Sequence, residues 1–135
     1  MTQKSINELA YKVVGCAIEV HKIMGPGLLE SIYQKCMLKE LSLNGIAARQ
    51  EYRIPLVYKG VDLESELIID ILVQDSIVVE LKSVERTLPI HKAQLLTYLK
   101  LTKKPKGLLI NFNTENITSG LVPIVTEKFA GLPKE

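Results

Sequence analysis

The residues best suited to chemistry are charged side chains that interrupt apolar runs. Asp70 lies inside one such run, and Glu80 and Lys82 lie inside the next. Burying an unpaired charge costs free energy, so charges in such segments need a partner or a function. Because side chains alternate along a strand, Glu80 and Lys82 share one face. A hairpin that closes around Asp75 would place Asp70 opposite the neighbourhood of Glu80.

This convergence of two carboxylates and an ammonium group has two interpretations. Carboxylates at close range repel each other unless a hard cation lies between them, and Mg²⁺ suits such a pair because it also binds phosphate. Lys82 could then orient or deprotonate a water, or stabilise charge that develops on phosphorus. The alternative is an ion pair of Lys82 with Glu80 or Asp70 at a strand end. Residue types alone leave both open.

Three further polar residues are weaker candidates taken one at a time. Glu30 falls in the first turn of a predicted helix that follows Gly25-Pro26-Gly27, where a carboxylate also stabilises the helix dipole. Gln94 and Tyr98 are one helical turn apart and therefore share a face. Tyr98 could equally be part of the core.

Hydrophobic periodicity predicts the elements that must position these residues. Helical spacing predicts three helices: from a Ser5–Glu8 capping box to a stop at Gly25, from about Leu28 to Leu43, and from Pro89 to about Thr102. Alternation or short apolar runs predict five strands: Tyr52–Tyr58, Val61–Leu67, Leu67–Val73, Ile77–Val84 and Leu108–Phe112. Leu121–Phe129 is expected to form a strand or a short helix. The order α-α-β-β-β-β-α-β indicates a mixed α/β domain.

Composition limits the class of protein. With 135 residues, 47% of them hydrophobic and 24% charged, residues 1–135 are expected to form one domain with its own core. No apolar run approaches the ~18 residues that span a bilayer, and the start lacks a signal peptide, so we expect a cytoplasmic protein without a membrane partner. The two cysteines have no zinc-like spacing. A net charge of +2 neither demands nor excludes nucleic acid.

Taken together, the motifs resemble a known family. Gly27, Glu30 and Tyr33 fit a GxxExxY signature, and Asp70 followed by Glu80-Leu81-Lys82 fits the D…ExK core of the PD-(D/E)XK nuclease superfamily. Gln94–Tyr98 resembles the QxxxY motif of RecB-type exonucleases in the same superfamily. The resemblance covers roughly residues 5 to 127. It departs from the superfamily name at Ile69, where that name has proline.

The resemblance implies a restriction-endonuclease-like core, in which a central mixed β-sheet is flanked by helices, with an extra N-terminal helix. Carried over by position, Lys82 would position the attacking water, and Gln94 and Tyr98 would hold the nucleic acid. The implied ligands of Mg²⁺ or Mn²⁺ are Glu30, Asp70, Glu80 and the backbone carbonyl of Leu81.

The function expected from this resemblance is metal-dependent hydrolysis of phosphodiester bonds, in DNA rather than RNA, with QxxxY favouring an exonuclease. One alternative is a nucleic-acid-binding or scaffold module that keeps the fold without useful catalysis. Another is a structural domain whose charges only form ion pairs. We also expect a homo-oligomer, by analogy with small nucleases that enclose their substrate.

A cluster of lysines follows the QxxxY segment and comprises Lys100, Lys103, Lys104 and Lys106. Such a cluster could contact backbone phosphates. Cations also stabilise the C-terminus of a helix, so the residues alone do not distinguish the two roles.

Overall fold

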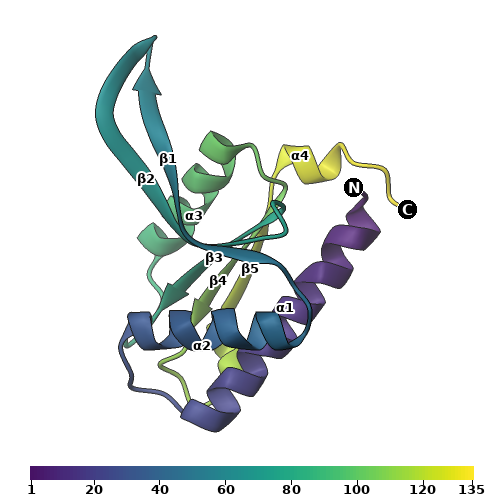
Figure 1. Cartoon of the computed structure of the whole chain (residues 1–135), viewed down its shortest axis with the longest axis vertical. Coiled ribbons are helices and arrows are strands. Elements are labelled where there is room, and N and C mark those ends of the chain that lie inside the picture. The colour runs from purple at the N-terminus through teal and green to yellow at the C-terminus, as the bar shows by residue number, and fades with distance from the viewer.

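A five-stranded mixed sheet lies at the centre of the computed structural model, which describes all of residues 1–135 (Figure 1). Its strands follow the chain order: β1 (Ala48–Tyr58), β2 (Val61–Val73), β3 (Ile77–Lys82), β4 (Lys106–Asn111) and β5 (Leu121–Val125). Only β3 and β4 pair in parallel; the other neighbours are antiparallel. The predicted mixed α/β fold class is confirmed.

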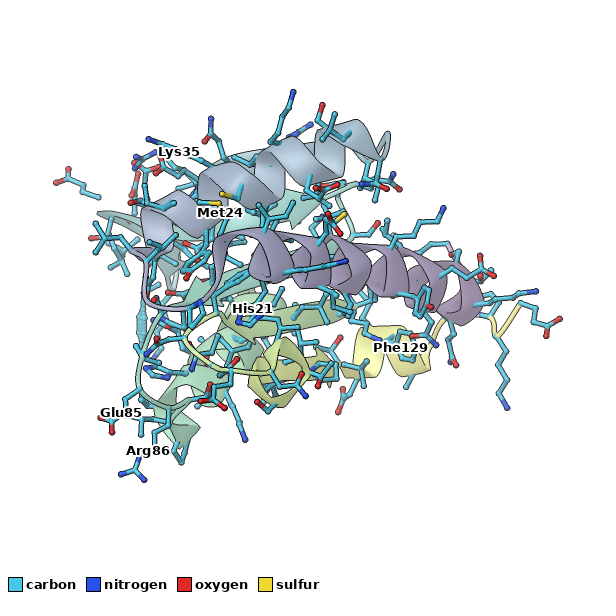
Figure 2. All side chains as sticks on the ribbon, turned by 90° about the horizontal axis from the view of Figure 1, so that it is seen from below. His21, Met24, Lys35, Glu85, Arg86 and Phe129 are labelled. Atoms are coloured by element: carbon cyan, nitrogen blue, oxygen red, sulfur yellow. The ribbon has the colours of Figure 1, made fainter.

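Helices cover both faces of this sheet. The helical elements are α1 (Gln3–Met24), α2 (Glu30–Leu43), α3 (Pro89–Thr102), the 3-10 turn η1 (Ile117–Gly120) and α4 (Glu127–Ala130). α1 and α2 pack against each other on one face (Figure 2), and α3 covers the other (Figure 1). None of the helices is long and apolar enough to cross a membrane.

The sheet separates two apolar cores, which fix the faces of the strands. The larger holds 18 buried residues, most of them from α1, α2 and the sheet, including Val79 and Leu81 of β3. The smaller holds six, including Val78 of β3 and both Leu95 and Leu99 of α3. Side chains alternate along a strand, so even-numbered β3 residues point toward α3. Glu80 and Lys82 therefore lie on the face that α3 covers.

Several details of the predicted elements are wrong, including the end of β3, which is Lys82 rather than Val84, and the start of β1, which is Ala48 rather than Tyr52. α1 begins at Gln3, because Thr2 caps it in a reciprocal pair with Ser5 rather than Ser5 with Glu8. Threonine is itself a good N-cap residue, so the helix begins about one turn earlier than predicted. The segment around Leu67 is not a break, since β2 runs unbroken from Val61 to Val73. Both expected elements of the C-terminal region are present, as β5 and α4.

Candidate active site

The strands β2 and β3 part at the two acidic residues. Their ladder ends at the pair Ile71–Val79, so Asp70 and Glu80 would form the next pair. Instead, the Asp70 amide donates to Glu80 Oε1 at 3.2 Å, and the Leu81 amide donates to Asp70 Oδ2 at 2.8 Å. Each carboxylate thus accepts a backbone amide from the opposite strand. We call this arrangement of Asp70 and Glu80 the carboxylate fork.

Burial makes the carboxylate fork electrostatically costly. Glu80 is only 6% exposed, and loss of solvent, reinforced by the charge of Asp70, raises its pKa to about 8. Burial also raises the pKa of Asp70, while the Leu81 amide opposes the rise and the charge of Glu30 adds to it. Two carboxylates with raised pKa values favour sharing a proton or binding a cation over carrying two unbalanced negative charges.

Lys82 contributes positive charge to the fork without being paired in it. Its charge opposes the rise in the pKa of both Asp70 and Glu80, which places it in their electrostatic neighbourhood. The only salt bridge in the structure joins Lys104 to Asp75 at 3.0 Å. The ion pair considered from the sequence is therefore absent, and the Lys82 ammonium is not engaged by either carboxylate.

Glu30 approaches the fork from the start of α2. Its Oε1 accepts from the Ser83 amide at 3.4 Å, and its charge acts on Asp70. No group of three or more His, Cys, Asp or Glu side chains lies close enough to hold a metal ion. The structure thus brings Asp70 and Glu80 together and leaves Glu30 beside them, held toward the segment that follows β3.

Tyr33 fixes the loop that precedes Glu30, a role that sequence reasoning missed. Its hydroxyl donates to the Gly25 carbonyl at 2.6 Å and accepts from the Leu28 amide at 3.1 Å. Its fully buried ring stacks on Phe112, with centroids 4.4 Å apart. Gly27 adopts a φ of 94°, which favours glycine. Two outer positions of the GxxExxY pattern, Gly27 and Tyr33, therefore position its central glutamate.

Two amide side chains also hold the site and were not predicted. Gln34, one turn after Glu30, donates to the Asp70 carbonyl at 3.2 Å. Buried Asn111 donates to the Val84 carbonyl at 2.9 Å and accepts from the Val84 amide at 3.1 Å. Two sequence signals could have indicated these residues. Gln34 is one helical turn after Glu30, and Asn111 is a lone polar residue in an apolar strand. Together these contacts tie β2 to α2 and the segment after Lys82 to β4.

α3 supplies Tyr98 to the same site. Burial raises the pKa of its hydroxyl, and the charges of Glu80 and Asp70 raise it further, so this group faces the fork. Gln94 lies one turn earlier, is exposed, and makes no hydrogen bond within the protein. Tyr98 therefore lies within electrostatic range of the carboxylates, and the Gln94 amide has no hydrogen-bond partner within the protein.

Comparison with known families bears on this geometry. The family model described as the PD-(D/E)XK nuclease superfamily matches residues 7–122, a range that includes the fork, Lys82 and Tyr98. The chain belongs to the PD-(D/E)XK nuclease superfamily. No curated protein and no solved structure matches it significantly. The matched range therefore contains both strands that part at the paired carboxylates and the lysine on the same face.

Proposed function

We propose that this chain is a metal-dependent nuclease that hydrolyses phosphodiester bonds, acting on DNA rather than RNA. The observation that carries the proposal is the carboxylate fork, in which Asp70 and Glu80 are held by backbone amides beside an unpaired Lys82. Superfamily membership supports nuclease chemistry in general. The choice of DNA, and the assignment to the GxxExxY group through Gly27, Glu30 and Tyr33, are our own inferences.

The donor set of the fork suits Mg²⁺ or Mn²⁺. Glu80 is buried and Asp70 is half-buried, the two repel each other, and each keeps one oxygen beyond the one that accepts an amide. Mg²⁺ is commonly bound by one or two carboxylates together with substrate phosphate. We propose Asp70, Glu80 and the Leu81 carbonyl as ligands, with Glu30 completing the set from α2. When bound, the cation supplies positive charge to the phosphate and makes a nearby water more acidic.

The remaining residues act on the substrate and on water. Lys82, on the same face as Glu80, orients the attacking water and offsets negative charge that develops at phosphorus. Tyr98 and Gln94 project from α3 and hold the nucleic-acid strand by hydrogen bonds to its backbone. The QxxxY pattern they form favours removal of nucleotides from an end, so we propose an exonuclease.

Cleavage of labelled DNA tests the assignment. Linear and closed circular DNA are incubated with the protein and Mn²⁺ or Mg²⁺, with matched RNA in parallel. Lys82→Ala and Asp70→Ala are expected to abolish cleavage, whereas Lys35→Ala and Asp62→Ala, changes of the same type at exposed positions, leave it intact. An exonuclease degrades the linear DNA and spares the circle. Cleavage that persists in both site variants or in excess chelator would refute the proposal.

One observation favours a second candidate, a module that binds nucleic acid without useful catalysis. The acidic residues do not form a three-ligand group, and a weakened metal site would leave only binding. This candidate predicts that DNA binds in Mn²⁺ with no cleavage and that Mn²⁺ produces no thermal stabilisation.

Two finer expectations accompany the main proposal. Both cysteines are free, which suits the reducing cytoplasm where we place the protein. We also propose self-association, by analogy with small nucleases that enclose their substrate. Light scattering tests this, and a monomer mass at micromolar concentration would contradict it.

A further inference from the structure

A basic cavity of about 550 Å³ lies between the C-terminal end of α3 and the segment that leads into α4. Its volume falls in the range of small-molecule sites. Three of its nine lining residues are hydrophobic and four are lysines. The lining residues are Leu96, Leu99, Lys100, Lys103, Lys104, Val125, Thr126, Glu127 and Lys128.

This cavity is on the flank of α3 that faces away from the carboxylate fork. Leu95 and Leu99 point into the small core, and each residue of a helix turns by about 100°. Tyr98 therefore projects on one side of this buried stripe, toward Glu80. Lys100 and Lys103 project on the other side. The cavity and the fork are two separate places on opposite sides of one helix.

The charge of the lining is strongly positive. It contains four lysines and one carboxylate, Glu127, and Lys104 also forms a salt bridge with Asp75, which is outside the lining. Favourable interaction with the helix dipole accounts for lysines at the end of α3. It does not account for Lys128, which comes from α4 and faces the same cavity. Two elements thus contribute cations to one space.

Backbone contacts hold the walls of the cavity in place. The Lys104 amide donates to the Leu99 carbonyl at 3.1 Å, and the Thr126 amide donates to the Pro105 carbonyl at 3.1 Å. The Thr126 hydroxyl also donates to the Lys104 carbonyl at 3.2 Å. A cavity with such walls is formed before any ligand arrives, which lowers the entropic cost of binding.

The residue that ends α3 carries backbone strain. Lys103 has φ of 57° and ψ of 38°, a left-handed conformation that helices usually assign to glycine at this position. A lysine there is less stable than glycine would be. The strained residue at this helix end is one of the four lysines that line the cavity.

We propose that this cavity binds the phosphate ester of a nucleotide, with the phosphate on the lysines and the sugar or base on Leu96 and Val125. A phosphate monoester carries a charge of about −1.5 to −2 near pH 7, which the lysines balance even with Lys104 engaged by Asp75. The apolar wall favours a nucleotide over inorganic phosphate. The nucleotide is either free or one unit of a polynucleotide that passes over α3.

Calorimetric titration of the full chain in EDTA tests the proposal without involving the fork, so it can fail or succeed independently of cleavage. The ligands are 5′-dAMP, deoxyadenosine, inorganic phosphate, an eight-nucleotide single strand and a polyglutamate peptide. We expect dAMP to bind, deoxyadenosine not to bind, and inorganic phosphate to bind more weakly than dAMP. The double variant Lys100→Gln/Lys103→Gln is expected to lose about tenfold in affinity, at roughly threefold for each exposed charge contact. The matched control, Lys12→Gln/Lys22→Gln on α1, keeps the affinity.

Two single variants separate binding from structure. Glu127→Gln removes the only carboxylate of the lining and is expected to tighten dAMP binding. Lys103→Gly relieves the left-handed strain, so it is expected to raise Tm while weakening binding. A rise in Tm with unchanged affinity would show that Lys103 is only a helix end.

The ligands also distinguish the source of the nucleotide. A strand that binds much more tightly than dAMP, and loses that advantage in the double variant, identifies the polynucleotide. A strand that binds no better than dAMP identifies the free nucleotide. Two results would overturn the proposal. One is that the double variant and its control bind dAMP with equal affinity, and the other is that polyglutamate binds as tightly as dAMP.

Discussion

Replacing Glu80 with glutamine is expected to stabilise the protein in the absence of metal at neutral pH. Glutamine has nearly the same shape and keeps an Oε1 atom that can accept from the Asp70 amide. It removes a carboxyl whose pKa rises from 4.5 to about 8 in the folded protein, because burial and the charge of Asp70 disfavour its ionised form. The substitution therefore removes an unfavourable charge while the hydrogen-bonding pattern of the fork persists.

The size of the effect follows from proton linkage. At pH 7 Glu80 is ionised in the unfolded chain and mostly protonated in the fold. This difference weakens folding by about 3 kcal/mol, since each pKa unit corresponds to about 1.4 kcal/mol. The contribution of Glu80 to stability is fully present below pH 4.5 and is lost as the pH rises through 8. The loss is a large part of the ~5–15 kcal/mol that stabilises a typical domain.

Urea denaturation in EDTA at pH 5 and pH 8 measures this difference. The wild type is expected to lose about 3 kcal/mol more than Glu80→Gln over this interval. Glu66→Gln, the same change at an exposed position, serves as the control and should follow the wild type. If Glu80→Gln shows the same pH dependence as the wild type, the raised pKa of Glu80 and the argument built on it are wrong.

Three further changes test the supports of the site. Tyr33→Phe removes a hydroxyl that bridges Gly25 and Leu28; urea denaturation should show a loss of about 1–3 kcal/mol, and cleavage should slow because Glu30 loses its fixed approach. Gly120→Ala places a methyl group against the Asn111 carbonyl oxygen and should destabilise by about 1–3 kcal/mol, whereas Gly15→Ala, in open space on α1, should be neutral or stabilising by thermal melting. Mn²⁺ should raise the Tm of the wild type and of Asp62→Asn but not that of Asp70→Asn, because only a native metal site converts binding into stability.

The sequence was most informative where charges interrupted apolar strands. Asp70 and Glu80 stand out because such charges are costly to bury, and the apolar runs on either side of Asp75 place them on adjacent strands. The break expected near Leu67 was wrong because a change from polar to apolar residues there marks the point where β2 becomes buried. A change in composition at such a point indicates where a strand becomes buried. It does not indicate where the strand ends.

The supports of the site were harder to predict because they depend on distant contacts. Gln34 and Asn111 are ordinary polar residues in the sequence, and their roles arise only when α2 meets β2 and β4 meets the segment after Lys82. The hydrogen bonds within the fork likewise form only when β2 and β3 lie side by side. Periodicity along one strand could indicate that Asp70 and Glu80 are neighbours, but not which amide each would accept.

The carboxylate fork also limits how this protein can evolve. Its two side chains replace the next rung of the β2–β3 ladder, so the amides of Asp70 and Leu81 need those oxygen atoms as partners whether or not a phosphodiester is ever cut. A descendant that lost cleavage would still be under selection to keep acceptors at both positions, with asparagine and glutamine the least disruptive replacements. Under the proposed mechanism, Lys82, whose side chain makes no hydrogen bond within the protein, would be lost before the fork in a lineage that no longer cleaves phosphodiesters.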